Sequence, residues 1–346
     1  MRGTAQGDMD LLVFTRHGIY CPRADIYVDP HSAVQRAVIT HAHSDHARPG
    51  HTSYLTHRLS APLLKQRLGK KIQVQAVEYG EPVMVNGVRI SLHPAGHIIG
   101  SSQVRFEYGS HVWAVSGDYK LEDDSISTPF EPVPCHVFVT ESTFGLPVFR
   151  WRQQEEVFEE MTSWWRENQR RGLPSVLVCY ALGKAQRVLA HIDVSLGPIF
   201  AHSAVVAVTT LLKEMGFRIP EVPVIPVDVP RAKLQHALIL VPPGFANKLP
   251  DFALAPYALG YVSGWMTFSA LKAQRALDRG FVLSDHADWD ALNFAVESTG
   301  AREIIVMHGY TSSFSRWLRE RGYDAREADA EAGVHSREVS VVRNDQ

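Results

Sequence analysis

The chain has 346 residues, of which 45% are hydrophobic and 21% charged, and its formal net charge is −2 at neutral pH. This composition is typical of a packed globular protein of one large domain or two ordinary ones. No apolar run approaches the roughly 20 residues that span a bilayer, so a membrane partner is not expected. The near-zero charge excludes a uniformly basic surface, and binding to a polyanion would need a local group of lysines and arginines.

The cysteines and the N-terminus bear on the cellular compartment. Cys21, Cys135 and Cys179 lie far apart, and no CxxC pair occurs. An odd, sparse set argues against a disulfide framework and against zinc held by cysteines. Residues 1–10 are polar and lack the charged and apolar regions of a secretory signal. We therefore expect a reduced, cytoplasmic protein.

Short apolar runs separated by glycine-rich turns dominate residues 11–150. β-branched runs of this length are typical of strands. They predict strands at residues 37–40, 88–92, 112–115 and 137–140, with a helix at 60–68.

A different pattern begins at Trp151, where helices and strands alternate. A charged amphipathic helix is expected at 152–170, closed by Gly172 and Pro174. Further strands are expected at 175–179, 199–200 and 237–241, and helices at 184–192 and 204–215. This alternation predicts a small βαβ unit with a parallel sheet.

The first pattern returns after about residue 278. Strands are expected at 280–283 and 303–307, and helices at 290–298 and 313–321. The simplest arrangement is one domain interrupted by a second. We therefore predict an α/β protein in which 1–150 and 279–346 form the first domain and 151–278 the inserted one.

Six predicted strands each end at residues able to bind a metal or exchange a proton. In chain order these residues are His41, His43, Asp45 and His46 together, then His97, Asp118, Glu141, His286 and His308. Strand ends in α/β proteins meet at a common rim. We therefore expect these side chains to converge.

The residue types in this set favour zinc, because imidazole and carboxylate suit a borderline-soft divalent ion. Alternate residues of an extended segment point the same way. His41 and His43 can therefore bind one ion, while Asp45 and His46 turn toward a second. Two ions about 3.5–4 Å apart can clamp the attacking and leaving oxygens of a phosphodiester. A single histidine after a strand is more often a hydrogen-bonded turn residue, but four ligand-type residues within six positions seldom cluster by chance.

These motifs resemble the metallo-β-lactamase superfamily and, within it, the β-CASP nucleases, over nearly the whole chain. The HxHxDH run at residues 41–46 is highly specific in this context. The other matching residues are Asp29 in Val-Asp-Pro, His97 in Pro-Ala-Gly-His, Asp118 in Ser-Gly-Asp-Tyr, Glu141 in Glu-Ser-Thr-Phe-Gly, His286 in Ser-Asp-His-Ala-Asp-Trp and His308 in Val-Met-His-Gly.

A narrower likeness is to bacterial ligase-associated DNA exonucleases. It depends on Gly-Ile-Tyr-Cys-Pro at residues 18–22, on residues 284–289 and on His-Gly-Tyr at 308–310. Such enzymes are usually encoded beside an ATP-dependent DNA ligase and an Lhr-type helicase, which this likeness implies as functional neighbours. DNA is then the expected partner.

The resemblance implies a fold and a set of metal ligands. The fold is a metallo-β-lactamase αββα sandwich with an inserted β-CASP α/β domain. Two Zn²⁺ ions per chain are implied, with Mn²⁺ as the alternative metal. The first ion would be held by His41, His43 and His97, the second by Asp45, His46 and His308, with Asp118 between the two and Asp29 supporting the metal loop.

The resemblance also implies Asp45, Glu141 and His286 as catalytic residues. His286 would donate a proton to the departing sugar oxygen or hydrogen-bond the phosphate, and Glu141 would orient it. The alternative for His286 is a structural histidine that caps a turn.

The inserted segment offers candidate contacts with nucleic acid. Gly183 and Lys184, in a run similar to the family's Ala-Leu-Gly-Arg-Ala-Gln, stand at a helix start and can present N–H groups and a cation to a phosphate. The alternative is a packing glycine beside a solvated lysine. Aromatic residues can stack on bases, although at helical spacing they more often belong to a core. The candidates are Trp164, Trp165, Trp265 and Phe268.

We therefore expect a zinc-dependent phosphodiesterase that cuts nucleic acid, as a DNA exonuclease acting in DNA repair. The main alternative is an RNA-processing endo- or exonuclease of the same family, because histidine at the position of His308 is typical of RNA-processing members. A catalytically silent scaffold subunit is disfavoured because every motif position is filled. A small-molecule hydrolase leaves the inserted segment unexplained. The sequence leaves open the polarity of digestion, the strand preference, the native metal and the oligomeric state.

Overall fold

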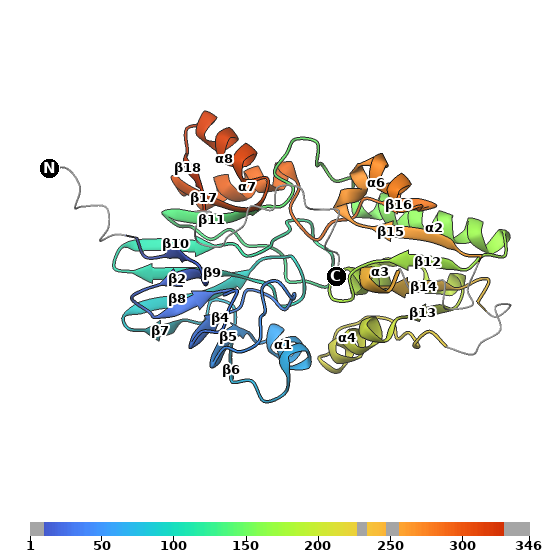
Figure 1. Cartoon of the computed structure of the whole chain (residues 1–346), viewed down its shortest axis with the longest axis horizontal. Coiled ribbons are helices and arrows are strands. Elements are labelled where there is room, and N and C mark those ends of the chain that lie inside the picture. The colour runs from blue at the N-terminus through green and yellow to red at the C-terminus, as the bar shows by residue number, and fades with distance from the viewer. Residues whose placement is uncertain (1–9, 227–233, 247–255, 329–346) are drawn as a thin grey trace. The chain divides into compact units, whose positions relative to one another are not determined.

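The structure is a computed structural model and describes residues 10–226, 234–246 and 256–328. The described chain divides into two compact units, one formed by residues 10–148 and 286–328 and the other by residues within 149–285. Figure 1 shows the elements of each unit. Within the described ranges, no helix combines the length and the apolar character needed to cross a membrane.

The first unit begins with a mixed sheet from the N-terminal part of the chain. Its strands in spatial order are β1 (Val13–Thr15), β2 (Gly18–Cys21), β3 (Ile26–Val28), β4 (Arg36–Val38), β5 (Ser53–His57) and β6 (Val74–Val77). β1 to β3 pair antiparallel, whereas β3 to β6 pair parallel. β4 therefore lies inside the sheet, and the chain leaves its carboxyl end directly into the histidine-rich loop.

The second sheet of this unit combines distant parts of the chain. Its strands in spatial order are β18 (Asp324–Glu327), β17 (Glu303–Gly309), β11 (Val137–Ser142), β10 (His111–Val115), β9 (Ser102–Tyr108), β8 (Val88–Pro94) and β7 (Val83–Val85). The neighbouring strands β10, β11 and β17 are parallel. Their carboxyl ends therefore meet at one edge, as predicted for Asp118, Glu141 and His308.

Two hydrophobic cores hold these layers together. Between the sheets, residues such as Ile19 and Val38 of the first sheet pack with Leu92 and Phe106 of the second. The opposite face of the second sheet packs against α7 (Trp289–Thr299) and α8 (Thr311–Glu320), and α1 (Ser60–Leu68) packs beside β5. Each large apolar side chain buried in this way stabilises the unit by about 1.5–3 kcal/mol.

The second unit is built on a parallel sheet. Its strands in spatial order are β13 (Ile199–Ala201), β14 (Leu238–Val241), β12 (Ser175–Val178), β15 (Ala258–Val262) and β16 (Arg279–Phe281). Its helices are α2 (Gln154–Arg170), α3 (Lys184–His191), α4 (Ser203–Glu214), α5 (Pro243–Ala246) and α6 (Ser269–Gln274), with short 3₁₀ turns at Val194–Leu196 and Gly264–Thr267. β12 and β14 are buried throughout and rich in valine and leucine, as expected for central parallel strands.

Most predicted elements are confirmed, including the helix at 60–68 and the parallel sheet of the inserted segment. The strands β1 to β3, β5 to β7, β9, β15 and β18 and the helices α5 and α6 are not among the predicted elements. One placement differs. The strand predicted at 280–283, assigned above to the final part of the first domain, corresponds to β16, which pairs with β15 in the second unit. The compact units consequently divide at 148/149 and 285/286. Cys21, Cys135 and Cys179 are free.

Candidate metal centre

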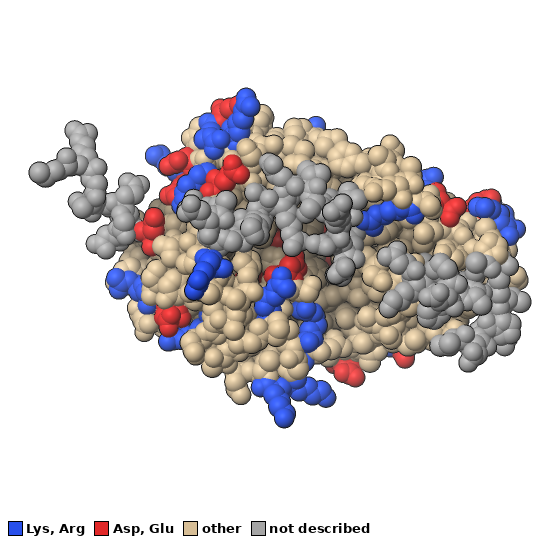
Figure 2. Space-filling model, in the orientation of Figure 1, with Lys and Arg blue, Asp and Glu red and all other residues tan. Residues whose placement is uncertain are grey.

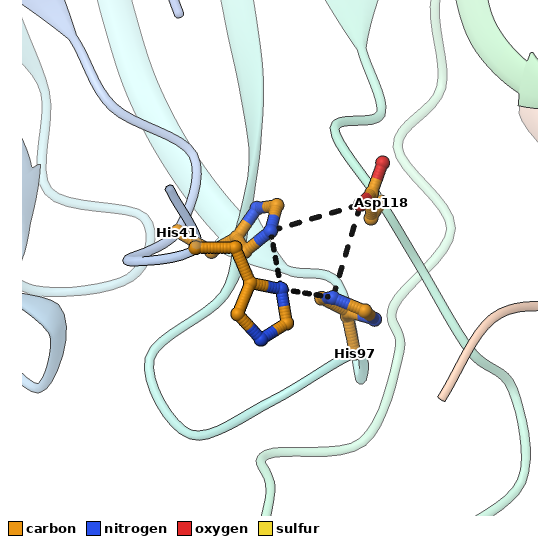
Figure 3. Close-up of side chains that lie close together, drawn as sticks. His41, His97 and Asp118 are labelled. Atoms are coloured by element: carbon orange, nitrogen blue, oxygen red, sulfur yellow. Dashed lines mark hydrogen bonds and ion pairs between the residues drawn. The ribbon is translucent and has the colours of Figure 1, made fainter. Parts of the chain in front are cut away.

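Two histidines of the loop after β4, His41 and His43, lie next to His97 from the loop after β8. His41 and His97 are buried, and His43 is half-buried. His41 Nε2 lies 3.1 Å from His43 Nδ1, and His97 Nε2 lies 3.1 Å from the same atom. Figure 3 shows His41, His97 and Asp118 turned toward one another. Residues far apart in the sequence thus present their donor atoms to one point.

Asp118, which follows β10, faces this histidine group. Its Oδ2 atom lies 3.3 Å from His46 Nε2, 3.7 Å from His41 Nε2 and 3.8 Å from His97 Nε2. One ligand atom from each of His41, His43, His97 and Asp118 lies within 4.8 Å of all the others. A carboxylate among imidazoles is a donor set suited to zinc.

Thr40 and Asp29 define which nitrogen of His41 faces the group. Thr40 Oγ1 donates to Asp29 Oδ2 at 2.5 Å, and His41 Nδ1 lies 3.1 Å from Thr40 Oγ1. The hydroxyl has one proton, so it accepts from His41 Nδ1–H, and Nε2 of the neutral ring carries the lone pair. Burial, together with the imidazoles of His46 and His97, holds the pKa of His41 well below its usual value, which favours this neutral form. The donor set therefore fits a metal cation.

A second group forms around His46. Its Nδ1 lies 2.7 Å from Asp29 Oδ2, an orientation that turns Nε2 toward Asp118 and places it 3.9 Å from Asp45 Oδ2. The His308 ring lies 5.8 Å from the His46 ring, centroid to centroid. Asp45 is the most open member, with 73% of its side chain exposed. The residues predicted to hold a second ion thus lie around His46, whose Nε2 is 3.3 Å from Asp118 Oδ2.

Charge in this second group is distributed unevenly. Although burial disfavours a charged imidazole, the carboxylates of Asp118, Asp45 and Asp29 raise the pKa of His46 well above its usual value. Burial and the neighbouring His46 lower the pKa of His308. The carboxylates therefore give this part of the site a strong affinity for positive charge.

Two glycines let the ligand loops approach closely. Gly96 precedes His97 with φ +74°, and a Cβ there would lie 2.1 Å from the carbonyl oxygen of Lys120, in the loop after Asp118. Gly309 follows His308 with φ +71°, and a Cβ there would lie 2.4 Å from Ser142 O. His308 itself has a positive φ of 59°, a conformation that is costly outside glycine and recurs at functional sites.

Glu141 and His286 form a pair beside the first group. Glu141 is buried, and its Oε1 accepts a hydrogen bond from Tyr119 N at 2.8 Å. Both of its carboxylate oxygens lie 3.0 Å from His286 Nδ1. A carboxylate accepts, so Nδ1 donates and Nε2 is the ring nitrogen turned away from Glu141. The His286 ring lies 4.6 Å from that of His97, which places the pair at the metal-ligand group.

Gly183 and Lys184 lie at the start of α3 in the second unit. Gly183 has φ +92°, and its N–H donates to Gln186 Oε1 at 2.8 Å. Lys184 is buried, so the alternative of a solvated lysine does not hold. Its Nζ donates to Leu283 O at 2.9 Å and lies 2.9 Å from Asp285 Oδ1. These contacts engage the ammonium group within its own unit, and the phosphate contact stays a prediction.

The aromatic candidates belong largely to packed surroundings. Trp165 is fully buried and donates through Nε1 to His236 O at 3.1 Å. Trp265 and Phe268 both contact Phe149 edge to face, at 5.6 and 5.5 Å between ring centroids. The core alternative therefore describes these side chains better than base stacking does.

Surface charge on the viewed face is mixed. Figure 2 shows lysine and arginine side chains in small groups, interspersed with acidic residues, among the described parts of that face. This agrees with the near-zero net charge. A polyanion would meet local basic groups rather than one broad positive surface.

The residue that sequence reasoning missed at this site is Thr40. Its backbone N–H donates to Asp29 Oδ1 at 2.8 Å while its hydroxyl links Asp29 to His41. Such outer contacts fix the orientation of metal-binding histidines. The sequence feature that could have indicated Thr40 is its position as a polar residue at the end of an apolar run, directly before His41.

Comparison with known proteins gives two kinds of sequence relative. No protein-family profile matches the chain. The chain is 28% identical over 340 residues to a protein of Opitutus terrae named Probable DNA ligase, a match that covers 95% of this chain and 32% of that protein. A stretch of 127 residues is 30% identical to Endoribonuclease YSH1 of Gibberella zeae, covering 35% of this chain and 15% of that protein. The chain thus spans about a third of the first relative and a smaller share of the second.

Among solved structures, the fold is similar to that of a protein of unknown function from Enterococcus faecalis V583. The TM-score is 0.57, the sequence identity is 13%, and the match covers 86% of this chain and 81% of that chain. At this identity the likeness concerns the fold alone, a mixed α/β architecture with several sheets. The sequence relatives carry the names of nucleic-acid enzymes, and the grouped imidazoles and carboxylates are the feature of this chain that fits such chemistry.

Proposed function

We propose that the chain is a metal-dependent phosphodiesterase that hydrolyses nucleic acid and belongs to the β-CASP nucleases of the metallo-β-lactamase superfamily. The observation that carries the proposal is the convergence of His41, His43, His97 and Asp118 within 4.8 Å. The layered first unit, whose two sequence segments flank that of the parallel-sheet unit, supports an αββα sandwich with an inserted α/β domain. We propose domain boundaries near residues 149 and 285, in place of 151 and 278, because β16 pairs with β15 of the inserted segment. The similarity to proteins named for nucleic-acid enzymes supports the substrate class.

The metal ligands follow from the two groups. One zinc ion would be held by His41, His43, His97 and Asp118, and a second by Asp45, His46, His308 and Asp118, with manganese as the alternative metal. When bound, such a pair of cations stabilises the charge that develops on a phosphodiester and supplies the nucleophile for hydrolysis. Asp29 and Thr40 orient His46 and His41 for this task through their hydrogen bonds.

His286 and Glu141 would move the proton that the reaction requires. With Nδ1–H donating to Glu141, His286 would also have to carry a proton on Nε2, as an imidazolium, and would transfer that proton to the departing sugar oxygen. Glu141 is itself fixed by the N–H of Tyr119, which holds the imidazole in one orientation. The alternative is a purely structural histidine, which a substitution distinguishes below.

DNA is the substrate that we propose first, with digestion from strand ends in DNA repair. The support is the match over 95% of the chain to a protein named Probable DNA ligase, together with the resemblance to ligase-associated exonucleases. A DNA ligase and an Lhr-type helicase would then be functional neighbours in the cytoplasm. Gly183 remains a candidate for contact with the strand, whereas the ammonium group of Lys184 is buried and engaged by Leu283 O and Asp285.

An RNA nuclease is the second candidate. The match of 127 residues to Endoribonuclease YSH1, and His308 at the position typical of RNA-processing members, favour it. The same metal ligands would serve either strand, so the substrate has to be measured.

The deciding experiment is digestion of matched 5′- and 3′-labelled DNA and RNA by one preparation, with metal analysis of that preparation. The proposal predicts close to two metal ions per chain and shortening of labelled DNA that stops when the metal is chelated. Preferential cutting of RNA would select the second candidate. Bound metal without hydrolysis of any polynucleotide would overturn the proposed activity and favour a scaffold.

A further inference from the structure

The second unit contains a buried cluster of charged side chains outside the metal centre. Lys184, Arg187 and Asp285 are only 3%, 1% and 6% exposed. Buried charges are costly unless they are paired and hydrogen-bonded. Such a cluster persists where the surrounding structure supplies its partners, so its contacts show what it holds in place.

Lys184 contacts the segment that leads out of β16. Its Nζ donates to the backbone carbonyl of Leu283 at 2.9 Å and lies 2.9 Å from Asp285 Oδ1. The side chain therefore ties α3 to two points of a segment located 99 residues later in the sequence.

Arg187 contacts the same segment from the next turn of α3. One guanidinium nitrogen, Nη1, donates to Ser284 O at 2.6 Å and lies 3.4 Å from Asp285 Oδ1. Nε and Nη2 both donate to Gln154 Oε1, at 3.1 and 2.8 Å. Gln154, at the start of α2, is buried as well. The planar guanidinium is thus fixed on both sides.

Together, Lys184 and Arg187 hold three consecutive residues, Leu283, Ser284 and Asp285, through two carbonyls and one carboxylate. The next residue in the chain is His286, whose Nδ1 lies 3.0 Å from Glu141. Consecutive Cα atoms are only about 3.8 Å apart, so a displacement of Asp285 is passed directly to His286.

We propose that Lys184 and Arg187 are positioning residues that set the place of His286 by clamping residues 283–285. This rests on the proposed function of His286 as proton donor. It gives Lys184 a role different from the predicted phosphate contact. An imidazole displaced by about 1 Å can lose on the order of 10²-fold in rate, so the clamp matters for turnover and not for folding alone.

The test is a double-mutant cycle with His286. Arg187→Lys keeps the positive charge but loses the planar guanidinium and its several donors. Lys184→Met keeps roughly the length of the side chain but loses the ammonium group. Each is made in the wild-type protein and in the His286→Ala variant. Lys213→Met is the matched control, because Lys213 forms an exposed ion pair with Glu221 in the same unit.

Each clamp variant is expected to lower kcat by roughly 10–100-fold with little change in KM or in bound metal. In the His286→Ala background the same changes should cost less than about twofold, because the clamp acts only through that imidazole. Equal losses in both backgrounds, or undiminished kcat in both folded clamp variants, would overturn the inference. Thermal unfolding identifies any variant that has failed to fold. The kcat of the other clamp variant then tests the inference.

A readout independent of activity separates this inference from the proposed function. The Nδ1 proton resonance of His286, assigned by its loss in His286→Ala, reports the contact with Glu141. We expect it to move or broaden in the clamp variants and to stay unchanged in Lys213→Met. If no polynucleotide is cut, the proposed function fails, and this resonance still decides: an unmoved signal refutes the clamp.

Discussion

The two buried polar groups of this chain satisfy their charges in opposite ways. Around His41 and Asp118, imidazole nitrogens and carboxylate oxygens face one another, and His41 Nε2 and Asp118 Oδ2 are both acceptors. Around Lys184 and Arg187, N–H donors meet carbonyls and carboxylates of the same chain. The first arrangement is a set of ligand atoms that could hold a metal ion, whereas the charges of the second are paired within the chain. Grouped ligand atoms therefore favour a cation site, whereas charges paired within the chain favour a structural role.

The largest expected effect is that of Asp118→Ala, because Asp118 Oδ2 faces His41, His46 and His97 together. We expect bound zinc to fall below two ions per chain and hydrolysis to fall by more than about 10⁴-fold, since the metals supply most of the charge stabilisation. Metal analysis and initial rates measure both. Glu320→Ala, an exposed carboxylate in the same unit, is the control. Full zinc content and activity in Asp118→Ala would show that the acceptors do not form a metal centre.

His286→Ala separates proton transfer from metal binding. We expect turnover to fall by roughly 10²–10⁴-fold while the zinc content stays intact, because His286 pairs with Glu141 and is not among the proposed ligands. Zinc content and kcat are measured on the same preparation. Loss of metal would reassign His286 as a ligand, and unchanged turnover would leave it as a structural histidine.

Gly96→Ala tests the close approach of the ligand loops. A Cβ at this position would lie 2.1 Å from Lys120 O, so the loop that carries His97 has to shift. We expect zinc affinity to fall by about 10–100-fold, the range found when ligand orientation is disturbed. Gly80→Ala is the matched control, because Gly80 has φ +76° against +74° at Gly96 but nothing within 4 Å of its Cβ position. Competition with a chromophoric chelator measures both, and equal losses would point to backbone strain alone.

His57 is a buried histidine outside both candidate metal-ligand groups, and His57→Gln tests its effect on stability. The His57 ring stacks on Tyr79 at 3.5 Å, and burial lowers its pKa to about 4. The folded protein keeps this imidazole neutral, whereas the unfolded chain takes up a proton near pH 6.5, so its contribution to stability is complete above that pH and is lost as the pH falls toward 4. Between pH 7 and pH 5 the free energy of unfolding should fall by about 2 kcal/mol less in the variant than in the wild type.

Urea unfolding of the metal-free proteins at several pH values measures that difference. The zinc content of His57→Gln should match the wild type, because the ring belongs to neither metal-ligand group. An unchanged pH dependence would mean that His57 is already protonated, or equally solvated, in the folded state.

The candidate ligand residues could be recognised in the sequence because each lies within or a few residues after an apolar strand. His41 to His46 stand together after β4, Asp118 follows β10 by three residues, and His308 lies at the carboxyl end of β17. Strands such as β1 and β7 escaped prediction because three residues carry too little periodicity. The sequence does not show to which domain β16 belongs, because its pairing with β15 depends on tertiary structure. The partners of Lys184 could not be predicted either, because Leu283 and Asp285 lie about a hundred residues away in the sequence.

The most direct test of the central claim is anomalous diffraction at the zinc edge from crystals of the protein grown with zinc. The account predicts two peaks, one among His41, His43, His97 and Asp118 and one among Asp45, His46 and His308. Absence of any peak within this set of side chains, in a preparation that hydrolyses polynucleotide, would contradict it.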